Sequence, residues 1–389
     1  MKFNALVISG TRCSGKSTCV SKLLVFDNRF FLVKAATTRP AREALDAINY
    51  YHITDEDFDK RDFFIKTQYG DFKYGIEKIE VQKVIKEKKI PVLIVSPESF
   101  LQFPIDKNAD FLSFFLDADD EVLIKRLIES RGSDKKILEI ETKNRTKDRS
   151  FSHNFIYRVN NSFSSFDEDL CKLIVKLWEH RNSGGLIPKS FISLLTKFDI
   201  LLKGADEKNI ASASYDLSLG DEYYYKGKIK TLSNKNPFIM IEPYDYAIVT
   251  SAEYASLPND IAGKFDLKIS LFCQGIILSN GPQVDPGFQG KLFCLLFNTS
   301  NSAVVIKRNE HYATLEFNKL VEATDGYIGK YQSKSSIINY LPSNTLQGGL
   351  NELKKEVEKL KNESIKLQTT ILGIISLLLA IIALFRALN

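Results

Sequence analysis

A loop near the N-terminus combines the residue types that bind the phosphates of a nucleotide. Residues 10–17 read Gly-Thr-Arg-Cys-Ser-Gly-Lys-Ser, the pattern G-x-x-x-x-G-K-S. Glycines let main-chain N–H groups surround a phosphate chain, Lys16 can reach the terminal phosphates, and the Ser17 hydroxyl can bind Mg²⁺. The sequence therefore predicts a site for ATP and Mg²⁺. Its residues are Gly10, Cys13, Ser14, Gly15, Lys16, Ser17 and Thr18.

The segments on either side of this phosphate loop are those that the motif requires. Residues 5–9 read Ala-Leu-Val-Ile-Ser and predict a buried strand, and the residues up to Leu24 predict a helix. A strand, the loop and a helix in this order direct the helix N-terminus at the phosphates, where the helix dipole favours negative charge. Motif and context therefore agree.

Three further segments follow the loop: TTRPAR at 37–42, DAINYY at 46–51 and YGDFKYG at 69–75. With the loop, they resemble guanylate kinase over residues 2–178. The resemblance implies an α/β fold and phosphoryl transfer from ATP to a nucleoside monophosphate. The residues that it places on the acceptor's phosphate are Arg39, Arg42, Tyr50 and Tyr74. Arginine suits such a dianion because it bonds it bidentately.

A fourth segment, 117–134, resembles the helix and lid of the same family. It implies that arginines stabilise the charge on the transferred phosphoryl group. With Lys16, the predicted catalytic residues are Arg126, Arg131 and Arg145. Surface salt bridges are the alternative role for these arginines.

The chain departs from the family in the base pocket. The family's guanine-reading Glu falls on Ile65, and its Thr after Tyr-Gly falls on Ile76. Both changes delete hydrogen-bonding groups, so we expect an acceptor base other than guanine. The family's acidic pair after the central strand is missing as well, with only Ser96 and Glu98 nearby. We therefore expect Ser17, phosphates and water to hold Mg²⁺.

A second stretch that could do chemistry is residues 282–291, Pro-Gln-Val-Asp-Pro-Gly-Phe-Gln-Gly-Lys. Apolar runs at 275–279 and 292–298 flank it and predict two strands joined by a tight Pro/Gly turn. The turn carries one carboxylate, Asp285, which could hold a nucleotide's sugar or a water. The alternative is that Asp285 only caps its own turn.

Four segments in order, at 214–220, 285–290, 312–317 and 329–332, resemble the dCTP deaminase branch of the dUTPase superfamily. The resemblance covers about 188–342. It implies a distorted β-barrel that assembles as a trimer with nucleotide sites between subunits. The candidate residues of this second nucleotide site are Asp216, Lys268, Ser270, Asp285, Lys330 and Tyr331.

The catalytic residues of that family carry over poorly. The position of its general-base Glu, three residues before an Asn, falls on Leu295, and leucine accepts no proton. Its Arg-Ser-Ser-Leu-Ala-Arg segment is Lys-Ile-Ser-Leu-Phe-Cys at 268–273. Phe288 replaces the ring-stacking Tyr of the dUTPase motif. We therefore expect nucleotide binding without deamination.

The C-terminal residues form a charged stretch with a heptad-like apolar pattern, followed by an uncharged apolar stretch. Apolar residues alternate at spacings of three and four between Leu350 and Leu367, which predicts a coiled coil at 348–368 or a single amphipathic helix. Thr369–Phe385 has no charge and would span roughly 25 Å as a helix, so 369–388 is a predicted transmembrane helix. Lysines precede it, which predicts a single-pass anchor with the soluble domains on the cytoplasmic side.

Composition limits the function classes. The net charge of the 389-residue chain is only +5, and no basic patch with interleaved aromatic residues occurs, so nucleic acid is not an expected partner. Five scattered cysteines without a CxxC pair argue against zinc.

The sequence predicts a guanylate kinase-like domain at 1–182 and a dCTP deaminase/dUTPase-like domain at 186–342, before the coiled coil and the anchor. Two functions stay open. The first is an ATP-dependent nucleoside monophosphate kinase. The second is a nucleotide-sensing trimeric membrane effector with little catalysis, for example in anti-phage defence.

Overall fold

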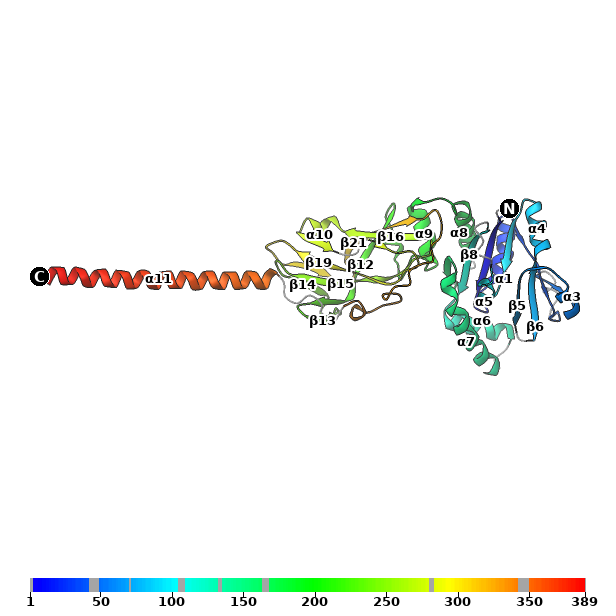
Figure 1. Ribbon diagram of the computed structural model, residues 1–389, viewed down its shortest axis with the longest axis horizontal. Coiled ribbons are helices and arrows are strands. Elements are labelled where there is room, and N and C mark those ends of the chain that lie inside the picture. The colour runs from blue at the N-terminus through cyan, green and yellow to red at the C-terminus, as the bar shows by residue number, and fades with distance from the viewer. Residues whose placement is uncertain are drawn as a thin grey trace.

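The chain forms three parts that follow one another in space (Figure 1). The computed structural model describes residues 3–41, 49–69, 71–103, 109–131, 135–162, 168–279, 283–341 and 350–388. An α/β domain comes first, a β-rich domain follows, and one long helix projects from the far end of the β-rich domain. The predicted α/β and β-rich folds and a helical C-terminal part are therefore confirmed.

A five-stranded parallel sheet is the centre of the N-terminal domain, in the order β2-β7-β1-β8-β9. Its strands are β1 (Phe3–Gly10), β2 (Phe30–Leu32), β7 (Ile90–Ile94), β8 (Ala109–Asp117) and β9 (Tyr157–Asn160). The helices are α1 (Lys16–Phe26), α6 (Asp120–Arg131), α7 (Lys135–Ser150) and α8 (Glu168–Glu179). Residues 5–8 of β1 are fully buried, as expected of a central strand covered on both faces. The phosphate loop follows β1 directly.

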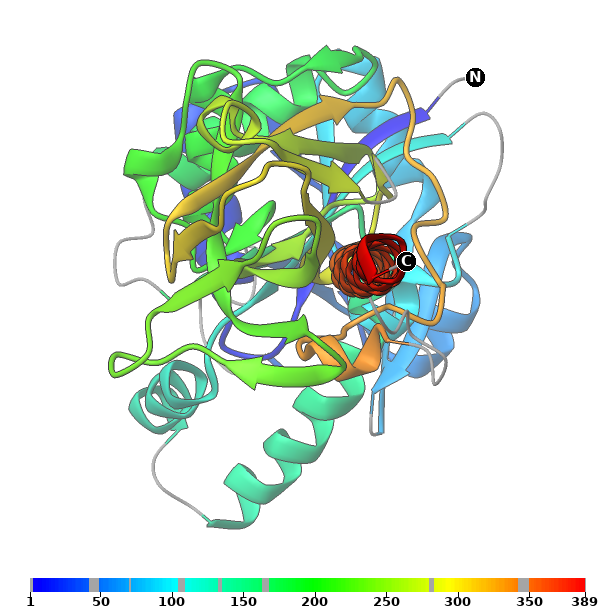
Figure 2. The ribbon, with the colours of Figure 1, turned by 90° about the vertical axis from the view of Figure 1, so that its left-hand side faces the viewer.

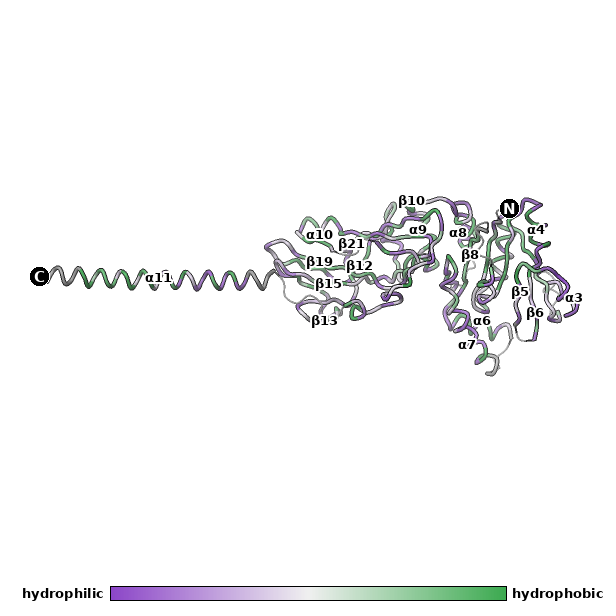
Figure 3. Tube along the Cα trace, viewed as in Figure 1, coloured by the Kyte–Doolittle hydropathy of each residue, from purple (hydrophilic) through white to green (hydrophobic). Residues whose placement is uncertain are grey.

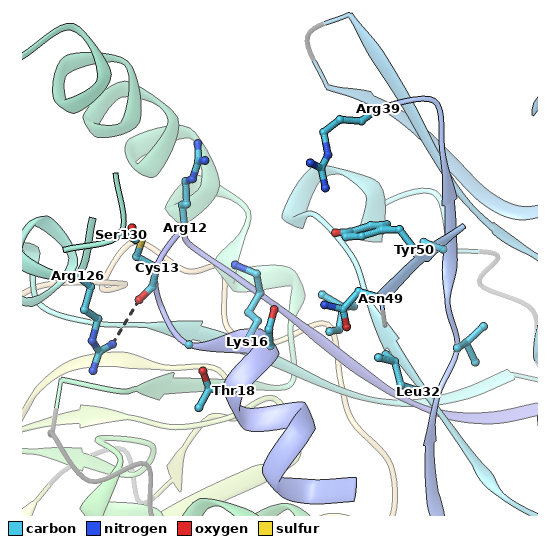
Figure 4. A pocket seen from close by; sticks show the side chains of 15 residues that line it. Arg12, Cys13, Lys16, Thr18, Leu32, Arg39, Asn49, Tyr50, Arg126 and Ser130 are labelled. Atoms are coloured by element: carbon cyan, nitrogen blue, oxygen red, sulfur yellow. Dashed lines mark hydrogen bonds between the residues drawn. The ribbon is translucent and has the colours of Figure 1, made fainter. Parts of the chain in front are cut away.

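A smaller four-stranded sheet carries the residues predicted for the acceptor. Its order is β4-β3-β6-β5. The elements of this part are β3 (Ala35–Thr37), β4 (Tyr50–His52), α3 (Asp55–Asp59), β5 (Phe63–Tyr69), β6 (Phe72–Glu77), α4 (Lys78–Lys86) and α5 (Pro97–Phe100). Strands β3 and β4 place Arg39 and Tyr50 on the side of the sheet that faces the phosphate loop (Figure 4).

The β-rich domain is one curled sheet with a small two-stranded sheet, β14-β20, beside it. The main path runs β17-β19-β15-β12-β21-β16-β18, and β10, β11 and β13 pair along its edges. Its long strands are β12 (Ser214–Tyr225), β15 (Tyr246–Ser256), β16 (Ile261–Leu267), β19 (Gln289–Asn298) and β21 (His311–Lys319). The short ones are β10 (Gly185–Leu186), β11 (Leu202–Lys203), β13 (Lys228–Thr231), β14 (Phe238–Ile241), β17 (Ile276–Ser279), β18 (Gln283–Val284) and β20 (Val304–Lys307). Helices α9 (Lys189–Lys197) and α10 (Ile269–Phe272) complete it.

The predicted strand pair around Asp285 exists, but the connection is longer than one tight turn. Strands β17 and β19 are antiparallel neighbours, as expected. Between them, β18 leaves this pair and joins β16 instead, with Val284 opposite Gly263. The tight turn lies between β18 and β19: Phe288 N donates to Asp285 O at 3.1 Å, and Gly287 has a φ of 77°. A Pro-Gly pair with positive φ at the glycine is typical of a type II turn.

The two domains share one hydrophobic core. Buried residues of α8, such as Leu177, and of α9, such as Ile192, belong to the same cluster. Gly185, which lies between the two predicted domains, is the first residue of β10 and pairs with Lys319 of β21. Tyr157 of β9 donates to Asp260 at 2.5 Å, and Asp260 forms an ion pair with Lys319 at 3.0 Å. The domains are therefore packed together directly.

Helix α11 (Leu350–Leu388) continues without a break for 39 residues. It projects from the β-rich domain as a single rod (Figure 1), and the view along the long axis shows it end-on in front of that domain (Figure 2). Figure 3 shows hydrophobic residues dominating its distal part. Within the described chain, it is the one helix long and apolar enough to cross a membrane. Its pairing with other copies as a coiled coil stays a prediction.

Candidate functional site

The phosphate loop has the backbone that the motif predicts. Gly10 has a φ of 139°, and a Cβ atom there would lie 1.9 Å from the Leu116 carbonyl oxygen, so glycine is required. Gly15 caps α1 with a φ of 92°. The ammonium of Lys16 donates to the main-chain oxygens of Gly10 at 3.0 Å and Thr11 at 2.7 Å. The loop therefore folds around its own lysine.

Two acidic residues of α7, which carry no local sequence signal, lie against this loop. Glu141 forms an ion pair with Arg12, the residue at the second variable position of the motif. Burial raises the pKa of Asp148 to about 6, and the charge of Lys16 partly opposes that rise. Burial also lowers the pKa of Lys16 to about 8, which the Asp148 charge partly offsets. A pattern of local spacing could not reveal these contacts, because α7 lies more than a hundred residues further along the chain.

A cavity of about 750 Å³ opens beside the phosphate loop. Figure 4 shows Arg12 and Lys16 on one side of it and Arg39 with Tyr50 on the other. The loop contributes Gly15, Ser17 and Thr18 to its lining as well. With Arg126, four cations from three separate segments therefore line one space, which suits a chain of phosphates between them.

The described residues predicted to bind the acceptor's phosphate contact one another through one cation–π contact and one ring–ring contact. Arg39 is 6% exposed, and its guanidinium lies 5.6 Å from the centre of the Tyr50 ring. The Tyr50 and Tyr74 rings meet edge to face at 6.0 Å. Arg42 lies outside the described residues. The structure thus brings together three of these four predicted residues.

A neighbouring cavity of about 360 Å³ shares Lys16, Arg39 and Tyr50 with the first. Its walls are largely apolar and include Ile65 and Ile76, which are 5% and 3% exposed. The polar side chains in its lining are those of Arg12, Lys16, Arg39, Tyr50, Lys66, Thr67, Tyr74, Ser96, Ser99 and Asp148. It lies beside Arg39, Tyr50 and Tyr74, the described residues predicted for the acceptor's phosphate.

The predicted lid arginines lie in different environments. Arg126 lines the larger cavity and donates to the carbonyl oxygens of Cys13 at 3.4 Å and Asn161 at 3.0 Å. Arg145 is buried and donates to Asp120 at 2.9 Å, and it lines neither cavity. The side chain of Arg131 lies outside the described residues. Of the two lid arginines whose side chains the structure describes, Arg126 is therefore the one placed beside the phosphate loop.

Mg²⁺ would have few protein ligands here. Ser17 lines the larger cavity and the Asp148 carboxyl lines the smaller one. No group of three or more His, Cys, Asp or Glu side chains that could hold a metal occurs in the part of the chain that the structure describes. One hydroxyl and one carboxyl fit an ion that keeps most of its waters and is otherwise held by phosphates.

The six residues predicted for the second nucleotide site form separate groups. Lys268 and Asp216 are joined by an ion pair at 2.8 Å, and Thr314 also donates to Asp216 at 3.0 Å. The Lys330 ammonium lies 4.8 Å from the Tyr331 ring centre. Asp285 accepts from Gln283 at 2.8 Å, and Ser270 lies exposed on α10. No hydrogen bond or ion pair of the described residues joins these groups into one site.

Leu295 lies in the middle of β19, opposite Ile248 of β15 and Ser279 of β17. Asn298, the residue used to align it, is buried and donates to Ile241 O at 2.9 Å. The strand register therefore leaves an apolar side chain at the position aligned with the family's catalytic general-base Glu.

Comparisons with known proteins agree with this two-part architecture. Residues 2–179 match the profile of the family "Guanylate kinase", and residues 189–320 match "dCTP deaminase-like". The dCTP deaminase of Pyrococcus abyssi is 33% identical over 141 residues, 36% of this chain and 90% of that protein. The dCTP deaminase of Thermococcus kodakarensis is 36% identical over 140 residues, 36% of this chain and 89% of that protein.

Two solved structures are similar at lower levels. The Agrobacterium tumefaciens 2'-deoxycytidine 5'-triphosphate deaminase has 19% identity and a TM-score of 0.32; the match covers 35% of this chain and 49% of that one. The guanylate kinase of Anaplasma phagocytophilum has 16% identity and a TM-score of 0.34 over 46% of this chain and 87% of that one. The chain belongs to the dCTP deaminase family through its β-rich domain, and its N-terminal domain is guanylate kinase-like.

Proposed function

We propose that this protein is a membrane-anchored nucleotide-binding protein whose N-terminal domain transfers a phosphoryl group from ATP to a nucleoside monophosphate. The observation that carries the proposal is the pair of adjoining cavities that share Lys16, Arg39 and Tyr50. One side offers a phosphate loop and the other offers Arg39, whose guanidinium lies against the Tyr50 ring. Two phosphorylated ligands could therefore meet end to end.

In this mechanism the protein positions two phosphates and stabilises charge. The phosphate loop and Lys16 hold the donor, and Arg39 with Tyr50 holds the acceptor's phosphate. Arg126, beside the loop, faces the charge that develops on the transferred group. Mg²⁺, when bound, would neutralise charge between the donor phosphates.

The base of the acceptor is proposed to be other than guanine. The walls at Ile65 and Ile76 offer no hydrogen-bonding side chain to a guanine edge, and both residues are nearly fully buried. Burying a polar edge of the ligand without a hydrogen-bond partner costs its desolvation energy, so these walls give guanine no preference over other bases. Besides the phenols of Tyr50 and Tyr74, the hydroxyls of Thr67, Ser96 and Ser99 are the uncharged side-chain donors and acceptors in the lining.

The β-rich domain is proposed to bind a nucleotide without deaminating it. Relatives named dCTP deaminase support a (deoxy)nucleotide as its ligand. Leu295 lies at the position aligned with the family's general-base Glu, which supports the absence of deamination. Because the six candidate residues form separate groups in one chain, we propose that neighbouring copies in a homotrimer complete this site.

The test is a coupled assay for ADP formation with a panel of ribo- and deoxynucleoside monophosphates. ATP consumption should depend on one class of monophosphate and on Mg²⁺, and Lys16→Ala should abolish it. Lys22→Ala, on the exposed face of α1 outside both cavities, is the matched control and should keep full activity. Turnover that survives Lys16→Ala would disprove the site.

A second function is favoured by the changes at Leu295, Ile65 and Ile76 and by the single exposed helix α11. In that case both domains bind nucleotides with little turnover, and binding is relayed to the membrane helices. Dye release from liposomes that carry the full chain distinguishes the two functions. A kinase that is only anchored leaves permeability unchanged by every nucleotide, whereas an effector releases dye with its ligand.

A further inference from the structure

Helix α11 carries one face whose residues repeat every seven positions, here lettered a to g with Leu350 at a. The a positions are Leu350, Val357, Ser364, Ile371, Leu378 and Phe385, and the d positions are Leu353, Leu360, Leu367, Ile374, Ile381 and Leu388. Because α11 is one continuous helix, this a/d seam runs in register from the charged part into the apolar part. Val357, Leu360 and Leu367 are 55%, 64% and 63% exposed in the single chain.

The charges that flank the seam are sorted by sign. Lys354 and Lys361 occupy e positions, whereas Glu356 and Glu363 occupy g positions. In two parallel helices, a g residue faces the e residue five positions further along the neighbour, so Glu356 faces Lys361. In two antiparallel helices, e faces e and g faces g, so lysine meets lysine and glutamate meets glutamate. The pattern therefore favours parallel pairing and opposes the reverse.

We propose that the a/d seam of α11 binds the same seam of a second copy of this chain, in parallel, with Glu356 of one copy paired to Lys361 of the other. The proposal concerns assembly and does not rest on the kinase or effector function. Three copies around one axis would repeat the same contact, and the number of copies is an outcome of the test.

The start of α11 supports this choice of face. Lys355, at an f position, lies 4.0 Å from Glu242 of the chain's own β-rich domain. An f position lies almost opposite the a/d seam on a helix, because residues are rotated by about 100° each. The chain's own domain therefore contacts the outer face and leaves the seam uncovered for another copy.

Disulfide cross-linking of the full chain in liposomes tests the proposal. The variants carry Leu360→Cys at a d position or Asn362→Cys at an f position, both with Cys273→Ser because Cys273 is exposed. Equivalent seam cysteines come within bonding range, so Leu360→Cys should cross-link about tenfold faster than Asn362→Cys. Equal rates, or a faster Asn362→Cys, would overturn the proposal. Val357→Cys provides a second seam position should Leu360→Cys fold poorly.

Charge reversal tests the orientation in the Leu360→Cys background. Glu356→Lys should slow cross-linking by roughly twofold to fivefold in a parallel pair, since lysine then faces lysine. Adding Lys361→Glu to the same chain should restore the original rate. In an antiparallel pair, Glu356→Lys would instead face a glutamate, so faster cross-linking of that single variant would overturn the parallel arrangement.

Discussion

The side-chain amide of Asn161 donates to the main-chain oxygen of Ser14 at 2.6 Å, within the buried base of the phosphate loop. Asn161 directly follows β9, the strand that contacts the β-rich domain. Arg158 of β9 donates to Leu257 O at 3.0 Å, and Asn160 donates to Asp199 at 2.9 Å. Strand β9 therefore contacts the second domain along its length, and Asn161 at its end contacts the phosphate loop.

The first prediction concerns this contact. Asn161→Ala should weaken ATP binding by about fivefold to tenfold, because a buried hydrogen bond that shapes the loop is lost. Isothermal titration calorimetry measures the effect. Asn160→Ala is the matched control, since it removes the contact with Asp199 and leaves the loop contact intact. Equal losses of ATP affinity in both variants would mean that β9 contributes only to the overall fold and has no specific effect on the phosphate loop.

The second prediction concerns Asp148 and pH. Its pKa is about 6 in the folded protein and 3.8 when solvated, so the folded state binds the proton more tightly. Stability from this group is therefore fully present below about pH 4 and is lost as pH rises to about 6. Asp148→Asn removes that dependence. Urea unfolding from pH 4 to 7 should show the variant gaining stability relative to the native chain over this window and a constant difference above it.

Lys16 shows the opposite window and serves as an internal check. Burial lowers its pKa from 10.5 to about 8, so the folded state binds this proton less tightly than the unfolded state. The cost of the buried charge is thus present below about pH 8 and is relieved as pH rises toward 10.5. Relative to Lys16→Met, the native chain should gain stability between these values. An unchanged difference across this range would contradict the burial of the Lys16 ammonium.

The third prediction restores hydrogen-bonding groups to the base pocket. Ile65→Glu combined with Ile76→Thr should increase the relative use of GMP by about tenfold or more, because paired polar groups on a base give large discrimination. Ile65→Leu combined with Ile76→Val keeps the pocket apolar and is the control. Monophosphate competition in the coupled assay gives the ratio. No gain for GMP in a folded double variant would mean that these residues do not face the base.

The phosphate loop could be predicted from sequence because its geometry is local. Gly10, Gly15 and Lys16 lie within seven residues, and the positive φ angles of the glycines follow from the motif. The ion pair of Arg12 with Glu141 could not be predicted, since it depends on how α7 packs against the loop from 129 residues further along the chain.

Long-range packing also sets contacts in the β-rich domain that the sequence alone could not reveal. Asp216 and Lys268 were predicted as two ligand-binding residues, and the strand pairing of β12 with β21 and β16 with β21 brings them together as an ion pair. In the same way, the tight turn at Asp285 follows from Pro286 and Gly287, whereas the detour of β18 depends on its partner β16. Turns and motifs formed by neighbouring residues could be predicted from the sequence, whereas contacts between distant strands could not.

The fourth prediction is the absence of deamination. Incubation of the full chain with dCTP should yield no dUTP or dUMP, because Leu295 cannot accept a proton from water. Chromatographic separation of the nucleotides measures this directly. Product that appears with the native chain and disappears with Asp285→Asn would reveal a different base and would refute the alignment at Leu295.

The last prediction concerns the membrane and assembly. The full chain should need detergent, because Thr369–Phe385 is uncharged and its described apolar side chains, such as Leu372 at 64% exposed, face outward. A chain ending at residue 341 should stay in solution and form a trimer, since the proposed second nucleotide site needs neighbouring copies. Light scattering at micromolar concentration gives the mass. A monomeric truncated chain would show that the β-rich domain does not drive assembly. The a/d seam of α11 would then be the part that holds the copies together. A full chain that stays soluble without detergent would show that this helix is covered by protein rather than lipid.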